Sequence, residues 1–431
     1  MMVSSLVARV VGQASRRGKI PRVPDGERLL ADVETWLTTE YADAVGATAR
    51  RALEDDVWEL TASLHPAAPE IVMTASDTGR VTVTAGTEIV GPGYHRFIGR
   101  VLERMGADLA ITWSQDADRG DFPDATAVTF ADRPEAERAY LGWLGRALVG
   151  ARASRAAGAS GIQFGLPDGV RYTFDGAIAT VLGPRDDAWI DAAIADTRVA
   201  IDVTPWWADA IDGACLLNRA LCLMWLEVRW RRPATKPERD LFDEVHRLLS
   251  RAFPLDPVLS YPWREWAELI ELRGLDDSMA RQVVERAARQ SEAGPAIGYR
   301  RGPVTITHEG WKLEIPGAFA ERRTAEEWWG GGAGRNVTLA AVQTGTEAGP
   351  MGAQAFVQQF AGELGPDAID HRAGGVVGRA RLNTDASSGV EVGVLEGYSA
   401  IVGSGAAIRI VFDDPTDWQW ALDTWRSLAP G

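Results

Sequence analysis

The sequence predicts a multidomain α+β protein, and three observations lead to this fold class. The chain has 431 residues, whereas a single domain usually holds roughly 100–200. Between residues 25 and 155, apolar residues at three- and four-residue steps alternate with short runs rich in β-branched residues. Helical spacing then prevails up to residue 293, and after residue 298 apolar residues recur at every second position, as they do in strands.

The boundaries between these regions follow from composition. The predicted units are a basic N-terminal arm (1–24), an α+β domain (25–155), a region of short strands and then helices (156–295), and a C-terminal domain (302–431). The two middle regions can form one unit or two, because the Ala-, Gly- and Ser-rich stretch 150–160 fits either a linker or an exposed helix end. Apolar residues make up 46% of the chain, which is enough for sizeable cores.

The N-terminal arm carries Arg9, Arg16 and Arg17 and has no acidic residue before Asp25. Its apolar residues fit a short helix, so one interpretation is a docking arm for an acidic partner or a membrane surface; the other is a frayed terminus. The arm does not fit a signal peptide, because its arginine pair follows the apolar patch. The best candidate for a membrane span, 215–226, is short and contains an arginine, so we expect a cytoplasmic protein without integral membrane contact.

In the region 25–155, helices and strands are predicted from the spacing of apolar residues. Leu30, Val33 and Leu37 lie on one face of a predicted helix. The turn residues of 76–79 separate two β-rich runs, which indicates a hairpin. The predicted helices are 29–41, 44–64, 94–105 and 135–149, and the predicted strands are 70–75, 80–85 and 109–113.

Helices dominate the region 156–295. The helix expected at 205–230 is apolar nearly all round, which predicts the central helix of its domain. Cys215 and Cys222 are seven residues apart on it, about 10 Å by helical rise, which is too far for a disulfide. We therefore expect two reduced core thiols. The other expected elements are strands at 161–166 and 170–174 and helices at 187–197, 237–253, 263–272 and 277–293.

The C-terminal domain combines alternating strands with a closing helix. It opens with GWKLEIPGAF (310–319), a strand that ends in a Pro-Gly turn. It closes with AIRIVFDDPTDWQWALDTWRSLAP (407–430), a strand followed by a helix. The other expected elements are the strands 304–308, 337–342, 378–382, 389–395 and 397–403 and the helix 352–364.

By these features, residues 302–431 resemble the Mog1/PsbP-like α/β fold, whose bacterial members include small lipoproteins and effector-chaperone proteins of secretion systems. The resemblance implies a curved antiparallel sheet flanked by helices, which usually serves as an adaptor or binding scaffold. It implies no catalytic constellation that could be carried over to this chain. The chain departs from the family pattern by an insertion at 330–334 and by the lack of a lipobox.

Charge and motif content argue against several functional classes. The formal net charge is −15, and an acidic surface repels phosphate backbones, so nucleic-acid binding is disfavoured. The sequence contains no P-loop, no Gly-x-Ser-x-Gly and no His-Glu-x-x-His motif. Its two cysteines have no histidine near them in sequence that could complete a zinc site. We therefore expect neither a metal ion nor a cofactor.

One segment offers residues suited to acid–base chemistry. Tyr94 and His95 follow a Gly-Pro-Gly turn at the start of a predicted helix, where backbone amides can bind an anion and a histidine can act as a base. Asp116 and Asp118 lie in an acidic loop that would converge with them if the strand at 109–113 lies beside the turn. The alternatives are an ordinary capping histidine and a solvated loop, because the loop fails the EF-hand pattern.

Residues that bind a partner are predicted where tryptophan and arginine flank a Gly-rich segment. Trp328 and Trp329 precede the sequence GGGAG and Arg335, which we interpret as a mobile loop whose tryptophans grip a partner. The other interpretation is a disordered loop with one tryptophan turned inward. The arginines of the N-terminal arm complete the predicted binding set.

The sequence therefore predicts a non-catalytic protein-binding adaptor, chaperone or regulatory accessory factor, whose partner is another protein of unknown identity. A hydrolase or other enzyme with its site around Tyr94 and His95 is the first alternative. A small-ligand sensor that uses some of the 17 tryptophans is the second. Nothing in the sequence indicates the oligomeric state.

Overall fold

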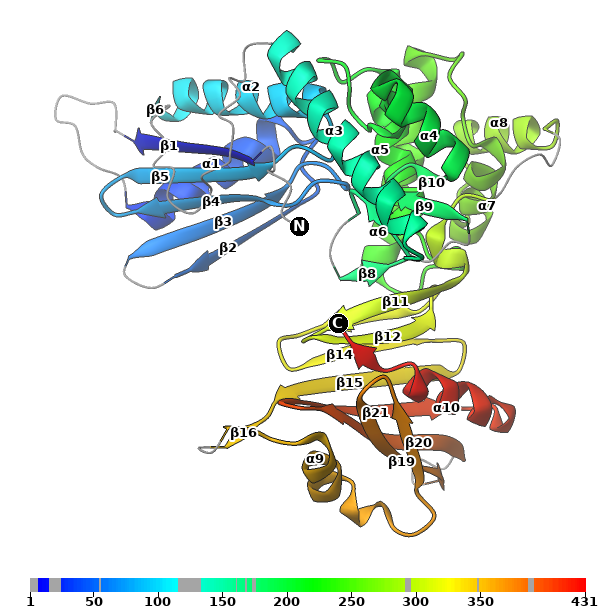
Figure 1. Ribbon diagram of the computed structural model, residues 1–431. Coiled ribbons are helices and arrows are strands. Elements are labelled where there is room, and N and C mark those ends of the chain that lie inside the picture. The colour runs from blue at the N-terminus through cyan, green and yellow to red at the C-terminus, as the bar shows by residue number, and fades with distance from the viewer. Residues whose placement is uncertain are drawn as a thin grey trace. The chain divides into compact units, whose positions relative to one another are not determined.

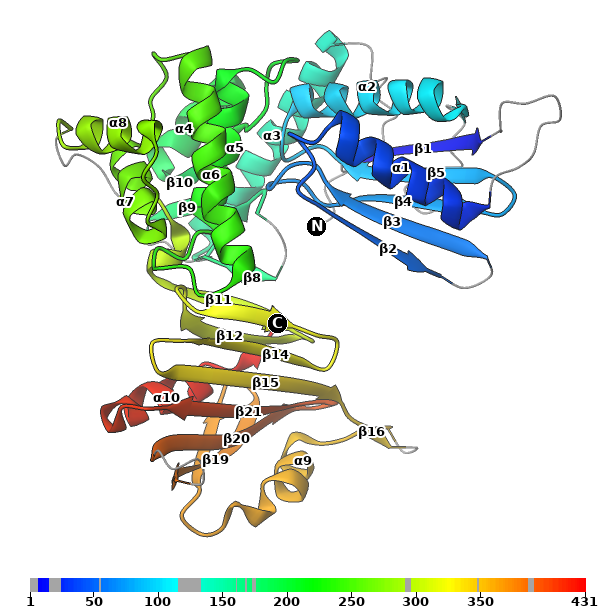
Figure 2. The same cartoon turned by 180° about the vertical axis from the view of Figure 1, so that it is seen from behind.

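The computed structural model divides into two compact units, each with helices and sheets (Figures 1 and 2). This arrangement confirms the predicted multidomain α+β class. Unit 1 comprises Met1–Pro167, Thr173–Glu227 and Leu241–Ile297, and unit 2 comprises Asp168–Tyr172, Val228–Asp240 and Gly298–Gly431. The structure describes residues 7–14, 25–53, 56–114, 133–159, 161–166, 169–172, 176–290, 296–346, 349–386 and 391–431.

The first half of unit 1 is an antiparallel sheet with helices α1 (Gly26–Glu40) and α2 (Pro92–Leu109) on one face (Figures 1 and 2). Within β4, Ile71, Met73 and Ala75 are buried and the residues between them are half-buried, because successive side chains point to opposite faces. The strands, in the order in which they pair, are β2 (Ala47–Ala52), β3 (Val57–Ser63), β4 (Ile71–Ser76), β5 (Arg80–Gly86), β1 (Val7–Ala14) and β6 (Ile111–Ser114).

The prediction of a helix at 44–64 is wrong, because β2 and β3 form a hairpin there. Alanine, arginine and glutamate favour helix locally, but Leu60 and Ala62 are buried on either side of half-buried Thr61, which is the period of a strand. Strand β3 also pairs with β4 along its other edge. Pairing within the sheet thus overrides the local helical preference.

The predicted N-terminal arm is partly built into the sheet. Strand β1 pairs with β5 on one side and with β6 on the other, so residues 7–14 are neither a short helix nor a detached arm. The backbone of Arg9 lies opposite Thr84 in this ladder. Arg16 and Arg17 lie outside the described residues, so a docking role for them stays a prediction.

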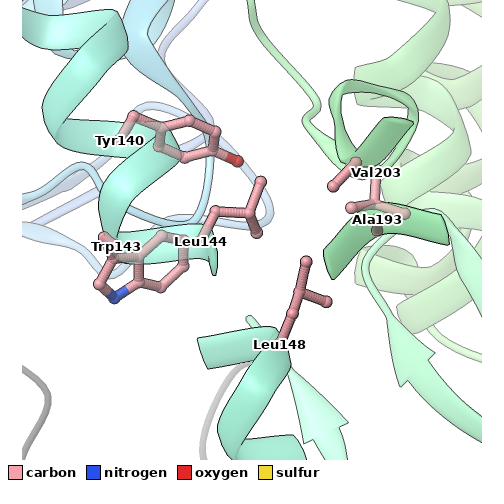
Figure 3. Packing of buried hydrophobic residues seen from close by; sticks show 7 residues of the cluster. Tyr140, Trp143, Leu144, Leu148, Ala193 and Val203 are labelled. Atoms are coloured by element: carbon pink, nitrogen blue, oxygen red, sulfur yellow. The ribbon is translucent and has the colours of Figure 1, made fainter. Parts of the chain in front are cut away.

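The second half of unit 1 is mainly helical and has an apolar core of its own (Figure 3). Its helices are α3 (Arg133–Ala156), α4 (Asp187–Ala195), the 3-10 helix η1 (Thr197–Val203), α5 (Gly213–Leu226), α6 (Lys236–Leu255, of which the first turn belongs to unit 2), α7 (Trp263–Arg273) and α8 (Ser278–Ala287). Strands β7 (Gln163–Phe164), β9 (Ala177–Thr180) and β10 (Gly183–Asp186) form a small sheet. The core cluster joins α3 to α4 and η1 and consists of Tyr140, Trp143, Leu144, Leu148, Ala193, Ala200 and Val203.

Helix α3 decides between the two interpretations of residues 150–160, because the helix continues to Ala156. Arg152 Nε donates to Asp191 Oδ1 at 2.7 Å, and Arg155 forms an ion pair with Asp187. Both acids belong to α4, so these pairs hold the last turns of α3 in place. The small-residue stretch is therefore mostly a helix end and not a linker.

Helix α5 is shorter than the predicted helix 205–230. It begins after Asp212, whose side chain accepts a hydrogen bond from the amide of Cys215 at 2.9 Å, as an N-cap does. The residues before it are not helical, and the amide of Trp206 donates to Val90 O at 2.9 Å instead. Cys215 and Cys222 are free and buried, in agreement with the expectation of two core thiols.

Unit 2 contains a seven-stranded antiparallel sheet and a smaller four-stranded one. In pairing order, the larger sheet holds β13 (Ala320–Arg323), β14 (Glu327–Gly332), β15 (Arg335–Gln343), β21 (Ser404–Phe412), β20 (Val392–Ile401), β19 (Val376–Asp385) and β18 (Ile369–Ala373). The smaller sheet holds β22 (Ala429–Pro430), β12 (Trp311–Pro316), β11 (Pro303–His308) and β8 (Val170–Arg171). A two-stranded ribbon, β16 (Gly345–Thr346) and β17 (Gly349–Pro350), lies apart from both.

Two helices cover opposite faces of the larger sheet of unit 2. Helix α9 (Ala353–Phe360) packs on β20 at Ala400, whereas Trp425 of α10 (Trp418–Arg426) donates to the hydroxyl of Ser399 at 3.1 Å. Neighbouring residues of a strand point to opposite faces, so α9 and α10 are separated by the sheet. The two strands predicted at 389–395 and 397–403 form the single strand β20. Gly397 does not interrupt it, because the missing side chain makes room for the Trp425 ring.

Segment 228–240 comes from the middle of the chain but belongs to unit 2. The Arg231 guanidinium donates to both carboxylate oxygens of Glu238, at 2.8 and 3.0 Å, and its Nε donates to Ala318 O at 2.6 Å. The Arg301 guanidinium lies 3.8 Å from the centroid of the Trp230 ring. The predicted region 156–295 therefore does not form one continuous piece.

Candidate functional site

The predicted catalytic pair, Tyr94 and His95, lies in the first turn of α2 and is closed off from solvent. Tyr94 is 0% exposed and His95 is 5% exposed. The Nδ1 atom of His95 lies 2.9 Å from Thr87 Oγ1, a buried hydrogen bond that fixes the imidazole ring. A general base must reach the proton that it abstracts, and a substrate in solvent cannot reach this ring.

Tyr94 belongs to a buried polar cluster with His65, Trp206 and Arg219. Its ring centroid lies 5.9 Å from that of His65 and 5.8 Å from that of Trp206. The Arg219 guanidinium donates to the backbone carbonyl of Ala44 at 3.0 Å and is 7% exposed. This cluster joins α2 and α5 to the end of the sheet, which is a structural role.

Burial sets the protonation of this cluster. It lowers the pKa of His65 well below the usual range of histidine, and the charge of Arg219 lowers it further. Burial also raises the pKa of the Tyr94 hydroxyl. At neutral pH the imidazole is therefore neutral and the phenol keeps its proton.

Acidification is expected to destabilise the protein through His65. The unfolded chain binds a proton on this residue below about pH 6.5, and the folded chain does not, so stability is complete above that pH and falls below it by up to about 1.4 kcal/mol per pH unit. The control is His65→Asn, whose Oδ1 can accept the Ala67 amide hydrogen bond that Nδ1 now accepts. Urea unfolding between pH 7.5 and 5 measures the unfolding free energy of the natural protein and of His65→Asn. If this free energy falls equally in both proteins as the pH is lowered, the lowered pKa of His65 is contradicted.

The acidic loop predicted to converge with His95 cannot be placed beside it. Asp116 and Asp118 lie outside the described residues, so their role stays a prediction. Within the described ranges, no group of three His, Cys, Asp or Glu side chains could hold a metal ion. No helix in that part of the chain has both the length and the apolarity to cross a membrane.

An open groove of about 930 Å³ runs beside α2 in unit 1. One wall is a stripe of α2 that includes Phe97, Arg100 and Ala107, residues whose spacing places them on one helix face. The other wall is the segment 209–211, and Tyr41 lies at the end of α1. The lining residues are Tyr41, Phe97, Arg100, Glu103, Arg104, Ala107, Asp209, Ala210 and Ile211.

Aromatic and aliphatic side chains give the groove an apolar floor. The rings of Tyr41 and Phe97 meet edge to face with centroids 5.6 Å apart, and Phe97 continues into the core with its centroid 4.8 Å from that of Trp206. Ile211 is 40% exposed, which is high for a large aliphatic residue. The floor is therefore anchored in the core and partly open to solvent.

Ion pairs hold the rim of the groove. Arg96 pairs with Asp209 across the two walls, and Arg104 pairs with Glu40 at the end of α1. The Arg100 guanidinium donates to the backbone carbonyl of Asp209 at 2.6 Å. These contacts define the walls before any partner binds.

The predicted mobile loop at 330–334 is instead part of a hairpin between β14 and β15. Trp328 is 0% exposed, and its indole N–H donates to Glu321 Oε2 at 3.1 Å. Trp329 points to the other side of the strand and is half-buried. Gly330 is required because a Cβ there would lie 2.3 Å from the Trp328 ring. Trp328 is therefore a core residue and does not grip a partner.

Arg335 lies apart from the two tryptophans, in a smaller hollow of about 320 Å³ in unit 2. Its Nε donates to Asp417 Oδ2 at 2.7 Å, and its guanidinium lies 4.7 Å from the centroid of the Trp420 ring. The hydrogen bond with Asp417 raises the pKa of Arg335. The charge of Arg335 is thus already balanced by Asp417 of the same unit.

The sequence analysis does not predict the groove beside α2, because its residues come from three separate segments. The spacing of Phe97 and Arg100 indicates an ordinary amphipathic helix. Ile211 falls within the predicted helix 205–230, where an apolar residue is expected to be buried. The exposed position of Ile211 follows from the late start of α5, which only the structure shows.

Comparisons with known proteins assign neither a family nor a function. No protein-family model matches the chain, and none of the curated proteins matches it. A crystal structure of a protein from Bacteroides thetaiotaomicron VPI-5482 aligns with a TM-score of 0.26 and 10% sequence identity, over 30% of this chain and 49% of that one. The alignment thus spans about half of that protein, at a similarity too low to carry an argument.

Proposed function

We propose that the chain is a non-catalytic protein-binding adaptor, chaperone or regulatory accessory factor of the cytoplasm, and that the groove beside α2 holds a segment of its partner. The composition of the groove carries this proposal. Phe97 and Ile211 contribute an apolar floor, and Arg100, Glu103 and Arg104 contribute a charged rim. An apolar centre within a polar rim is the usual anatomy of a protein interface.

Two further observations favour protein binding over the alternatives. Tyr94 and His95 are enclosed, which disfavours a hydrolase at that position. The groove is open along its outer side, whereas small-molecule pockets bury most of their ligand. A segment of another protein fits an open groove better than a small ligand does.

Substitutions in the groove are expected to abolish partner capture without unfolding the protein. Ala107→Arg and Ile211→Asp place charge at exposed, apolar positions that line the groove, so at least a tenfold loss of affinity, about 1.4 kcal/mol, is expected at an unchanged melting temperature. The matched control is Val149→Asp on α3, where the side chain is 54% exposed and does not line the groove. Quantitative co-purification from the native host measures the effect. Equal capture by all variants would overturn the proposal.

We also keep the Mog1/PsbP-like assignment of residues 302–431 as a proposal. What supports it is an antiparallel sheet with α9 on one face and α10 on the other, which is the arrangement that the resemblance implies. A crystal structure compared strand by strand with solved members would test it. A different strand order would overturn it.

A further inference from the structure

We infer that the partner segment held in the groove is an amphipathic α-helix with an acidic side chain against Arg100 and a basic side chain near Glu103. This inference rests on the proposed function and names the chemistry of the partner. It follows from the shape of the groove, from the charges on its rim and from its apolar floor.

The shape of the groove favours a helix over an extended peptide. Its long wall is the face of α2 from Phe97 to Ala107. This face is about 15 Å long, because a helix rises about 1.5 Å per residue. An extended peptide that binds as a β-strand gains its affinity by pairing with the free edge of a sheet. None of the residues that line the groove belongs to a strand, so a bound strand would find no ladder there.

The charges on the rim define what the bound helix must carry. The flanking arginines of α2, Arg96 and Arg104, are already paired with Asp209 and Glu40. Arg100 is exposed and, among the residues that the structure describes, forms no ion pair; its contact is with a backbone carbonyl.

Glu103 is likewise exposed and makes no ion pair with any described residue. These two opposite charges lie three residues apart, on neighbouring turns of one helix face. A complementary helix therefore presents an acid and a base three or four residues apart.

The floor supplies the anchors for such a helix. A helix in a groove is held by apolar residues at positions i, i+3, i+4 and i+7. The half-buried Tyr41 ring and the exposed Ile211 side chain offer apolar surface in the same groove as the charged pair, and Phe97, which is 4% exposed, packs against Tyr41. The partner helix is thus amphipathic, with its apolar stripe inward and its charges at the rim.

Site-specific crosslinking in the full-length protein identifies the bound segment. A photoreactive benzoylphenylalanine replaces Ala107 in one strain and Val149 in a control strain, and mass spectrometry maps the partner peptide attached to each. The mapped segment is then synthesised as a peptide, and its affinity for the purified full-length protein is measured by titration calorimetry.

We expect the peptide to gain helical circular dichroism on binding and to lose binding when proline replaces a central residue. Arg100→Glu should weaken binding at least tenfold, and reversal of the facing acid in the peptide to lysine should restore it. The melting temperature of Arg100→Glu should fall only slightly, because Arg100 is exposed and loses one hydrogen bond, to Asp209 O; Arg100→Gln, which removes the charge without reversing it, is the control for that loss.

The outcomes separate this inference from the proposed function. Identical crosslinks from positions 107 and 149, or none from position 107, would overturn protein binding in the groove. A segment that crosslinks at position 107 only, but still binds with a central proline or binds Arg100→Glu equally well, would leave the proposed function standing and overturn the amphipathic helix.

Discussion

Replacing Glu238 with alanine is expected to lower the unfolding free energy of unit 2 by about 1–3 kcal/mol. Glu238 is 7% exposed and accepts two hydrogen bonds from the Arg231 guanidinium. It also accepts the amides of Ala234 at 2.7 Å and Thr235 at 3.3 Å. Its removal leaves the half-buried Arg231 guanidinium and two backbone amides without this acceptor, and a polar group that loses its partner on folding is destabilising.

The carboxylate of Glu238 is ionised at neutral pH. Burial alone would raise its pKa, but hydrogen bonds from Arg231 and the Ala234 amide, together with the charges of Arg231 and Arg229, outweigh burial and lower the pKa. The ion pair is therefore present under physiological conditions, and its loss is the expected cause of the instability.

Hydrogen exchange resolved by mass spectrometry is the suitable measurement, because a protein of two units need not unfold in one step. Peptides that cover 228–240 and 318–323 should exchange faster in Glu238→Ala. The matched control is Asp240→Ala, which breaks the exposed Lys236–Asp240 pair (2.5 Å) and should cost less than about 0.5 kcal/mol. Similar exchange in both variants would show that Glu238 does not hold this segment.

Replacing Trp328 with alanine is expected to cost about 3–5 kcal/mol. The side chain is fully buried in β14, and its indole N–H donates to Glu321. The same Glu321 carboxylate accepts from Arg300 at 2.7 Å, so the loss of Trp328 also disturbs a buried ion pair. Thermal and urea unfolding should both show the effect.

The neighbouring tryptophan is the natural control for this prediction. Trp329 is half-buried on the other side of β14, so Trp329→Ala should cost only about 1 kcal/mol. If both tryptophans gripped a partner, as the sequence pattern suggests, the two substitutions would instead reduce partner capture and spare stability. If Trp328→Ala and Trp329→Ala both lowered the unfolding free energy by the same small amount, the burial of Trp328 would be contradicted.

Long amphipathic helices and hairpins with clear turns could be predicted from the sequence. The helix around Val33, the hairpin at 70–85 and the closing strand and helix at 407–430 follow from spacing and turn residues alone, and all are present. Their stabilising contacts lie close together in sequence, so local patterns contain enough information.

Elements that depend on distant partners could not be predicted. Strands β2 and β3 were expected to be a helix because their composition favours helix, and it is the pairing of β2 with β3 and of β3 with β4 that makes them strands. The Gly-rich segment of β14 suggested a loop, yet Gly330 makes room for the Trp328 ring and Gly331 for that of Trp329. The groove is lined by Ile211 and Phe97, which are far apart in sequence and come into the same groove only when the chain folds. No local sequence pattern indicates that they line one groove.

The assignment of segment 228–240 to unit 2 has a consequence for synthesis on the ribosome. Arg229 and Glu321, which form an ion pair, are 92 residues apart in the chain. At roughly 5–20 residues per second, the ribosome needs about 5–18 seconds to make the second after the first. During that interval the segment lacks its contacts with residues 298–431, and unit 2 cannot form completely until those residues have been made. Substitutions here should therefore reduce the yield of newly made protein in addition to lowering the stability of the folded protein.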